Sequence, residues 1–246
     1  MPRFFIRQNQ IEETDGTKTV TITGDDAHHI SRALRMASGE KIEVCDMQKN
    51  LYTCELNGFF EGYVTAKVLE QDRADTEPKC FIRLYQALAK GDKMETIIQK
   101  SIECGACEIV PFSSERCVVK LDKKDEQKKI DRWQKIAEGA SKQSGRGMIP
   151  AVKNVLSFKE LLNSLEGVVL FCYEGEDTVS IKEALQKTKI EGDVSVIIGS
   201  EGGFSQREAE QLKEAGAISV GLGKRILRCE TAPTFALACI SYELEL

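Results

Sequence analysis

Two short stretches near the C-terminus carry residue types that suit the binding of a small polar molecule. IIGSEGGFS occupies residues 197–205 and LGKRILRCETAP occupies residues 222–233, and each follows an apolar run. Glycines directly after a strand let a ligand approach main-chain groups closely, because they carry no side chain. The first stretch is neither a Walker A loop nor a GxGxxG motif. The pair indicates a main-chain cradle for a flat or polar molecule, and two ordinary tight turns remain the alternative.

Residues 116–153 form a basic stretch in a chain that is acidic overall. They hold eleven Lys and Arg against five Asp and Glu, whereas the formal net charge of the whole chain is −5. Charge gathered in one stretch is typical of a surface that binds phosphate groups. A solvated helix face with many salt bridges gives the same pattern, so both interpretations stay open.

Cysteines and histidines offer little support for metal chemistry. Cys104 and Cys107 form one CxxC pair, without the second pair of ligands that a structural zinc needs. Several of the nine cysteines lie in apolar runs, which favours reduced, buried thiols. The sequence predicts no metal site and no membrane partner, because no apolar run approaches the length of a membrane span. The N-terminus lacks the apolar stretch of a signal peptide, which predicts a cytoplasmic protein.

The elements that must position the two turns change type near residue 72. Short strands are expected at 17–24, 40–46, 50–59 and 62–71, a spacing typical of a small β-barrel. One helix interrupts them at AHHISRALRM, with Asp25 or Asp26 as its cap and Ile30, Ala33 and Leu34 on one face. The predicted domains are therefore residues 1–72 and residues 73–246.

Strands and helices alternate from residue 80 onward. Strands are expected at 80–88, 107–112, 168–173, 193–199 and 218–223, with helices between them and a last helix from residue 231. This alternation predicts an α/β fold with a parallel sheet that has helices on both faces. Ligands bind such sheets at the carboxyl ends of the strands, and both glycine turns fall at such ends.

Five ordered blocks of this chain resemble the RsmE family of ribosomal RNA small-subunit methyltransferases. They are PRFFI with HHISRALRM, KGDKMETIIQKSIECGACEIVPFSSER (90–116), AEGASKQSGRGMIP (137–150), GSEGGFS and LGKRILRCETA. Ser200 departs from the pattern, because the family usually has Pro there. The resemblance implies S-adenosyl-L-methionine-dependent methylation of N3 of a uridine in 16S ribosomal RNA. It further implies a SPOUT-type C-terminal domain with a deep trefoil knot, a PUA-like RNA-binding β-barrel at the N-terminus, and a homodimer.

The resemblance also assigns roles to residues. We expect the cofactor to contact groups at three strand ends: Tyr173, Glu174, Ile198, Gly199, Glu201, Gly202, Gly203, Leu222, Gly223, Ile226 and Leu227. We expect contacts with the RNA substrate, either 16S ribosomal RNA or the small subunit, from Arg3, His29, Arg32, Arg35, Arg116, Lys142 and Arg146.

Loss of the uracil N3 proton places negative charge on O2 and O4, so a nearby cation is needed. Arg228 is the expected cation and Glu230 its orienting partner or a base, while a salt bridge that fixes the turn is the alternative. Two other functions stay open at this point. One is a catalytically silent RNA-binding assembly factor for ribosomes. The other is an enzyme that binds a different nucleotide, such as NAD or ATP, in the same cleft. The absence of GxGxxG and Walker A motifs argues against it.

Overall fold

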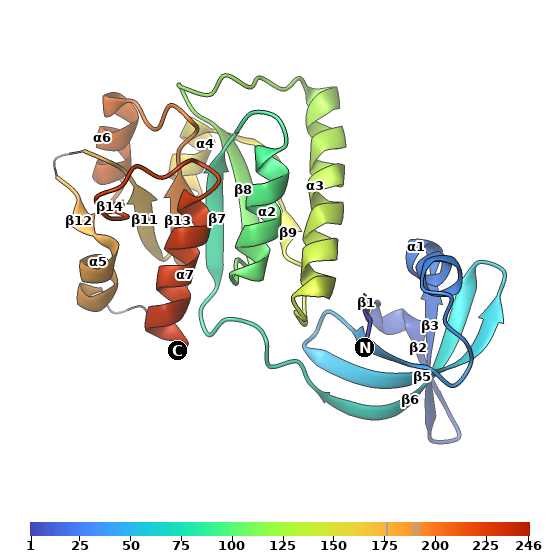
Figure 1. Ribbon diagram of the computed structural model, residues 1–246. Helices are drawn as coiled ribbons and strands as arrows, with labels where there is room; N and C mark the ends of the chain where they lie inside the picture. Colours follow the sequence, from blue (N-terminus) through green and yellow to red (C-terminus); the bar gives the residue numbers. More distant parts are fainter. Residues whose placement is uncertain (176, 189, 191) are drawn as a thin grey trace. The chain divides into compact units, whose positions relative to one another are not determined.

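The computed structural model describes residues 1–175, 177–188, 190 and 192–246, and its contacts divide the chain into two units (Figure 1). The first unit contains Met1–Glu77 and also Ser141–Ile149, and the second contains Pro78–Ala140 and Pro150–Leu246. The domain boundary after residue 72 stays a prediction. By contacts, the first unit extends to Glu77 and takes in a short segment from the middle of the chain.

The first unit is a mixed β-sheet with the order β1-β4-β5-β6-β3-β2. Its elements are β1 (Arg3–Phe5), η1 (Gln8–Gln10), β2 (Ile11–Thr14), β3 (Thr17–Thr23), α1 (Gly24–His28), η2 (His29–Ala33), β4 (Lys41–Cys45), β5 (Asn50–Phe60) and β6 (Tyr63–Arg73). The four strands expected from the sequence correspond to β3, β4, β5 and β6. Buried residues alternate along β3 and β5, as the period of two requires. Register shifts within the β5–β6 pair bend these long strands, as β-bulges do.

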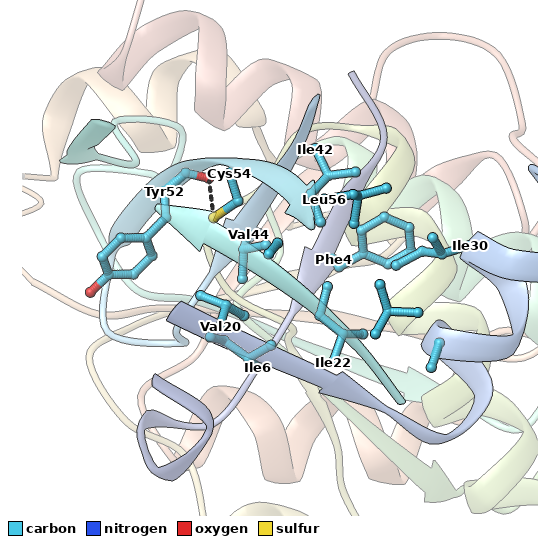
Figure 2. Close-up of a cluster of buried hydrophobic side chains, with 13 residues drawn as sticks. Phe4, Ile6, Val20, Ile22, Ile30, Ile42, Val44, Tyr52, Cys54 and Leu56 are labelled. Atoms are coloured by element: carbon cyan, nitrogen blue, oxygen red, sulfur yellow. Dashed lines mark hydrogen bonds between the residues drawn. The ribbon is translucent and has the colours of Figure 1, made fainter. Parts of the chain in front are cut away.

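The core of the first unit is a single apolar cluster (Figure 2). Its larger members come from the N-terminus, from β3 to β5 and from η2: Phe4, Ile6, Val20, Ile22, Ile30, Ile42, Val44, Tyr52 and Leu56. Cys54 lies among them, with its Sγ 3.8 Å from the Tyr52 carbonyl oxygen. Burial raises the pKa of the Cys54 thiol to about 12, so this cysteine packs as a small apolar side chain.

The N-terminal helix differs from its prediction in two respects. It begins at Gly24 after Thr23, so Asp25 and Asp26 lie in its first turn and do not cap it. Its last turn is a π-helix, which changes the angular spacing of side chains. For this reason Ile30 is fully buried, whereas Ala33 and Leu34 are exposed.

Ser141–Ile149 is held in the first unit by close packing and by a buried ion pair. A Cβ atom on Gly147 would lie 2.5 Å from the Cβ atom of Ala74, so a side chain at residue 147 would collide with the β6 end of the sheet. Arg146 is 4% exposed and pairs with Glu77 at 2.5 Å. Arg3 donates hydrogen bonds to the carbonyl oxygens of Gly145 and Arg146.

The second unit is built on a sheet with the order β10-β8-β7-β13-β11-β14-β12, in which every strand pair among the described residues is parallel. Its strands are β7 (Ile82–Ala87), β8 (Glu108–Ser113), β9 (Ala151–Val152), β10 (Leu156–Ser157), β11 (Val168–Cys172), β12 (Val179–Ser180), β13 (Val194–Ile198) and β14 (Ile218–Gly221). Its helices are α2 (Lys93–Glu103), α3 (Lys123–Gln143, ending in the first unit), α4 (Phe158–Asn163), α5 (Ile181–Lys187), α6 (Gln206–Glu214) and α7 (Ala232–Leu244). The expected strands and helices are all present, and the parallel sheet is confirmed.

Helices cover both faces of this sheet, and its central strand, β13, is completely buried. All five residues of β13 are buried, as expected for a parallel strand whose two faces are packed. Helices α2, α7 and α5 form one layer in which α7 contacts both neighbours (Figure 1). The buried face of α2 consists of Met94, Ile97, Ile98, Ser101 and Ile102, the spacing of one face of an α-helix. Among the described residues, no helix has the length and apolar character needed to cross a membrane.

Candidate active site

The first glycine turn follows β13 and is anchored in the core by one aromatic ring. The Ser200 carbonyl oxygen accepts a hydrogen bond from the Gly203 amide at 2.9 Å, which closes the turn. Phe204, next in the chain, is 2% exposed and stacks on Phe112 with ring centres 6.4 Å apart. Ser205 then begins α6 with a capping box, because its hydroxyl accepts from the Glu208 amide. The turn is therefore held at both ends.

Each glycine of this turn has a distinct structural reason. A Cβ atom on Gly199 would lie 3.0 Å from the Gly203 Cα atom, and one on Gly202 would lie 3.1 Å from the Arg116 Cβ atom. Gly203 has φ +65°, and a Cβ atom there would meet nothing within 4 Å. Open space beside a left-handed glycine is what a main-chain cradle for a ligand requires.

Two buried polar atoms next to the turn have no hydrogen-bond partner among the described residues. They are the hydroxyl oxygen of Ser200 and the amide oxygen of Gln86, at the end of β7. The Gln86 amide nitrogen lies 3.3 Å from the Gly199 carbonyl oxygen. Buried polar atoms without partners are uncommon, and they are expected where a ligand completes the hydrogen bonding.

The second glycine turn follows β14 and leads into α7. Gly223 has φ +108°, Leu222 and Leu227 are half-buried, and Ile226 is 83% exposed. An isoleucine with this exposure leaves apolar surface free to cover a flat ligand. The Arg228 carbonyl oxygen accepts from the amides of Thr231 and Ala232, which starts the helix.

The two turns flank β11, because this strand lies between β13 and β14 in the sheet. Tyr173 follows β11, and its amide donates to the Val220 carbonyl oxygen of β14 at 3.1 Å. Glu174 is exposed beside it. Thus three neighbouring strands bring the predicted cofactor residues to one edge of the sheet, although the sequence places them tens of residues apart.

Lys93, at the start of α2, connects the two turns. Its Nζ atom lies 3.0 Å from Glu201 Oε1 in the first turn and 3.7 Å from Glu230 Oε2 in the second. The Lys90 amide donates to the same Glu201 oxygen at 3.0 Å. Sequence reasoning missed Lys93, because a lysine in the first turn of a helix carries no local signal of a distant partner. Glu201, predicted to contact the cofactor, is thus occupied in joining the turn to α2.

The hydrogen bonds of this cluster keep both carboxylates ionised. Burial acts to raise the pKa of Glu201, but hydrogen bonds from the Lys90 amide and Lys93 outweigh it and lower the pKa. A backbone hydrogen bond is the main cause that lowers the pKa of Glu230, with smaller contributions from Cys229, Lys93 and Arg228. The hydrogen bond to Glu201 raises the pKa of Lys93. A lowered pKa makes Glu230 a weak base, which favours its orienting role.

The seven predicted RNA contacts fall into two groups. Three of them are engaged inside the first unit: Arg3 with Glu43 at 2.8 Å, Lys142 with Asp26 at 2.6 Å, and Arg146 with Glu77. The other four are exposed: His29, Arg32, Arg35 and Arg116. Arg116 also donates to the Gly202 carbonyl oxygen at 2.9 Å, so it supports the first turn. Contact with RNA stays a prediction for all seven.

The site suits an organic cofactor by the chemistry of its groups. It offers an open glycine cradle, buried polar atoms without partners and an exposed apolar side chain, all features of small-molecule sites. In the described part of the chain, no group of three or more His, Cys, Asp or Glu residues could hold a metal ion.

Comparison with known proteins identifies the class of protein from two matched domains. Residues 76–241 match the RNA methyltransferase domain, and residues 22–68 match the RNA methyltransferase PUA domain. Among the relatives, the ribosomal RNA small subunit methyltransferase E of Bacillus subtilis is 39% identical and covers 100% of this chain and 98% of its own length. The enzyme of the same name from Synechocystis is 32% identical over 99% of this chain and 78% of its own. The chain belongs to the ribosomal RNA small subunit methyltransferase E family.

Solved structures agree with this assignment. A ribosomal RNA small subunit methyltransferase E from Neisseria gonorrhoeae, bound to S-adenosyl methionine, is 31% identical, with a TM-score of 0.85 over 98% of this chain and 97% of that one. A methyltransferase from Legionella pneumophila, in complex with the same cofactor, is 28% identical, with a TM-score of 0.86 over 98% and 96%. The predicted fold class is confirmed, whereas the threading of the knot stays a prediction.

Proposed function

We propose that this protein transfers a methyl group from S-adenosyl-L-methionine to N3 of a uridine in 16S ribosomal RNA. One observation carries the proposal: three neighbouring strand ends, of β13, β11 and β14, bring a glycine cradle, the exposed Ile226 and two half-buried leucines to one edge of the sheet. Family membership supplies the reaction type, and relatives with the cofactor bound support its identity.

The residues present divide the work between binding and charge. The turn from Gly199 to Gly203 would hold the cofactor through main-chain groups, and Leu222, Ile226 and Leu227 would enclose its flat ring. When bound, the cofactor supplies an electrophilic methyl group. Arg228 would stabilise negative charge on the uracil oxygens through its planar, permanently charged guanidinium. Glu230 would act as an orienting residue, through its ion pair with Lys93, which also pairs with Glu201.

The substrate and assembly complete the proposal. The PUA-like unit would bind ribosomal RNA, either free or within the small subunit, and two chains would form the active homodimer. Ribosomal RNA is modified in the bacterial cytoplasm, so we infer that the enzyme works there. Light scattering of the purified protein tests the dimer, for which a molar mass of one chain would be a negative result.

Nucleoside mass spectrometry tests the reaction. Small subunits and free 16S RNA lacking the modification are incubated with the protein and S-adenosyl-L-methionine, and the expected product is 3-methyluridine. If the protein binds the cofactor but leaves both RNA substrates unmodified, this result would contradict the proposal. Protein that binds RNA but not the cofactor would instead be a catalytically silent assembly factor.

A further inference from the structure

A stacked pair of exposed aromatic rings lies at the tip of the β5–β6 hairpin, in the first unit. The ring centres of Phe60 and Tyr63 are 4.6 Å apart, and the ring planes differ by 14°. Phe60 is 54% exposed and Tyr63 is 38% exposed. Parallel, offset rings are a favourable arrangement for aromatic side chains, and a third flat ring can extend such a stack.

The hairpin holds the two rings in place before any partner binds. Phe60 and Tyr63 are Cα partners on either side of the turn, so their side chains lie on the same face of the sheet. Gly62, in the turn, has φ +85°, which a tight hairpin turn needs. A Cβ atom on Gly58 would lie 2.6 Å from a carbon of the Phe60 ring, so this ring lies against the main chain of β5.

The face of the sheet that carries the rings is polar. Its residues on β3 and β6 are in register with one another, and none of them is buried: Thr19, Thr21, Thr23, Thr65 and Lys67. The residues between them, such as Val20 and Val64, belong to the core on the other face. Hydroxyl and ammonium groups are common partners of the sugar and phosphate groups of nucleic acids.

Exposed cations follow in the chain next to the ring pair. Thr23 is the Cα partner of Tyr63 and directly precedes α1, which packs against β6 (Figure 1). Arg32 in η2 and Arg35 after it are both exposed. Aromatic rings combined with positive charge are typical of surfaces that bind single-stranded nucleic acid.

We propose that Phe60 and Tyr63 stack on an unpaired base of the RNA substrate. The inference rests on the proposed function, because it names how the first unit recognises that RNA, and it gives the rings no part in methyl transfer. The hairpin lies within residues 22–68, which match the RNA methyltransferase PUA domain. The base must be unpaired, since bases within a duplex are already stacked on their neighbours. Hydroxyls and cations around only two rings suit RNA better than an apolar protein surface.

The same ring pair could serve only to stabilise the hairpin, as cross-strand aromatic pairs do. The full-length protein is therefore titrated with a short oligouridylate that carries one central 2-aminopurine, a base whose fluorescence falls when it stacks on another ring. Phe60→Leu and Tyr63→Leu keep apolar bulk but remove one aromatic face. We expect the wild type to quench the fluorescence, and each leucine variant to quench less and to bind at least about fivefold more weakly.

Phe59→Leu is the matched control. Phe59 is an exposed aromatic residue of the same hairpin, but its Cα partner is Val64, so it lies on the opposite face of the sheet. This variant should bind and quench as the wild type does, and Phe60→Trp, which keeps an aromatic face, should do the same. Thermal unfolding shows whether each variant is folded.

Two results would overturn the proposal. One is a wild-type protein that binds the strand without quenching, a measurement that needs no variant. The other is wild-type affinity and quenching in both leucine variants, which would leave the ring pair with a role in hairpin stability alone.

Methylation by the wild-type protein is measured separately, so the two ideas fail independently. If 3-methyluridine forms while the leucine variants bind and quench normally, the ring assignment fails and the proposed function stands. If quenching depends on the rings but neither 16S RNA nor small subunits are methylated, the proposed function fails and the ring assignment stands.

Discussion

Arg228 brings a positive charge to the site that a substrate can reach. It is exposed, and its side chain makes no ion pair or hydrogen bond with any described residue, although its main chain starts α7. The alternative from the sequence, a salt bridge that fixes the turn, therefore gains no support within the described chain. Its catalytic role stays a prediction with a direct test.

Arg228→Ala should lower the rate of methyl transfer at saturating RNA and cofactor by at least about a hundredfold, the usual effect of losing one charge-stabilising donor. Arg228→Lys should recover part of the rate, because an ammonium cannot copy the planar fork. Arg225→Ala, an exposed arginine of the same turn, is the control and should keep its activity. Wild-type turnover in Arg228→Ala, measured in single-turnover assays, would make Arg228 a structural residue.

Lys93 should act by holding the two turns together. Lys93→Met removes the link between Glu201 and Glu230, and we expect the dissociation constant of the cofactor to rise a few-fold, because partly exposed ion pairs contribute modestly. Lys90→Met is the matched control, since Lys90 uses only its amide to bind Glu201. Calorimetry measures both variants. Equal affinity in Lys93→Met and the wild type would show that the link is dispensable.

The same cluster predicts a broad pH range for cofactor binding. The pKa values of Glu201 and Glu230 lie below their usual 4.5, and the pKa of Lys93 lies above its usual 10.5. The link is fully formed above the usual carboxylate pKa and is lost only as pH falls through the lowered values. On the alkaline side it persists through the usual lysine pKa. Titration of these three groups should therefore leave the cofactor affinity unchanged between about pH 5 and about pH 10. A change of affinity near neutral pH that is absent in Lys93→Met would contradict this prediction.

At the scale of elements, the turn between β13 and α6 makes the strictest demand on residue type. Gly203→Val places a β-branched residue at φ +65°, where such residues are rarely found, and puts a side chain into the open space of the proposed cradle. We expect a folded variant without measurable cofactor affinity by calorimetry. Gly216→Val has the same conformational strain, with φ +86°, but lies at the other end of α6 and should still bind the cofactor. Equal affinity in the two variants would remove the cradle assignment.

The sequence predicted the elements of the second unit well, because local signals decide them. The α6 start is one example: Ser205 and Glu208 form the capping box that their spacing indicates, and Gly216 follows the helix end. The N-terminal helix was harder, since a π-turn is not visible in apolar spacing, and Ala33 and Leu34 were wrongly placed inside. The strand ends that meet at the site were predicted as one sheet edge, but the position of β11 between the two turns was not. The Lys93 link depends on side chains from separate elements, which periodicity does not pair.

At the scale of the molecule, Arg146 shows that a basic stretch does not act as one surface. Ser141–Ile149 belongs to the first unit, whereas most of the predicted basic stretch belongs to the second. Arg146 is buried against Glu77 and its charge is therefore structural in this fold. The exposed basic residues of α3 keep the phosphate-binding interpretation.

Arg146→Ala should destabilise the protein by about 3 kcal/mol, because it leaves the Glu77 carboxylate buried without its partner. Lys128→Ala, which removes an exposed pair with Asp125, should cost less than about 0.5 kcal/mol. Denaturant unfolding measures both. An Arg146→Ala protein of unchanged stability but weakened RNA binding would contradict the structural role and support the predicted RNA contact.

The return of Ser141–Ile149 to the first unit has a consequence for synthesis of the chain. Domains usually fold in the order in which they leave the ribosome, the N-terminal one first. Here the N-terminal sheet lacks the partner of Glu77 until Ile149 has been made. At the usual rates of translation this delay lasts about 4 to 14 seconds. During that interval all strands of the first sheet have been made but Ser141–Ile149 is still missing, so the first unit is completed only after much of the second unit has been synthesised.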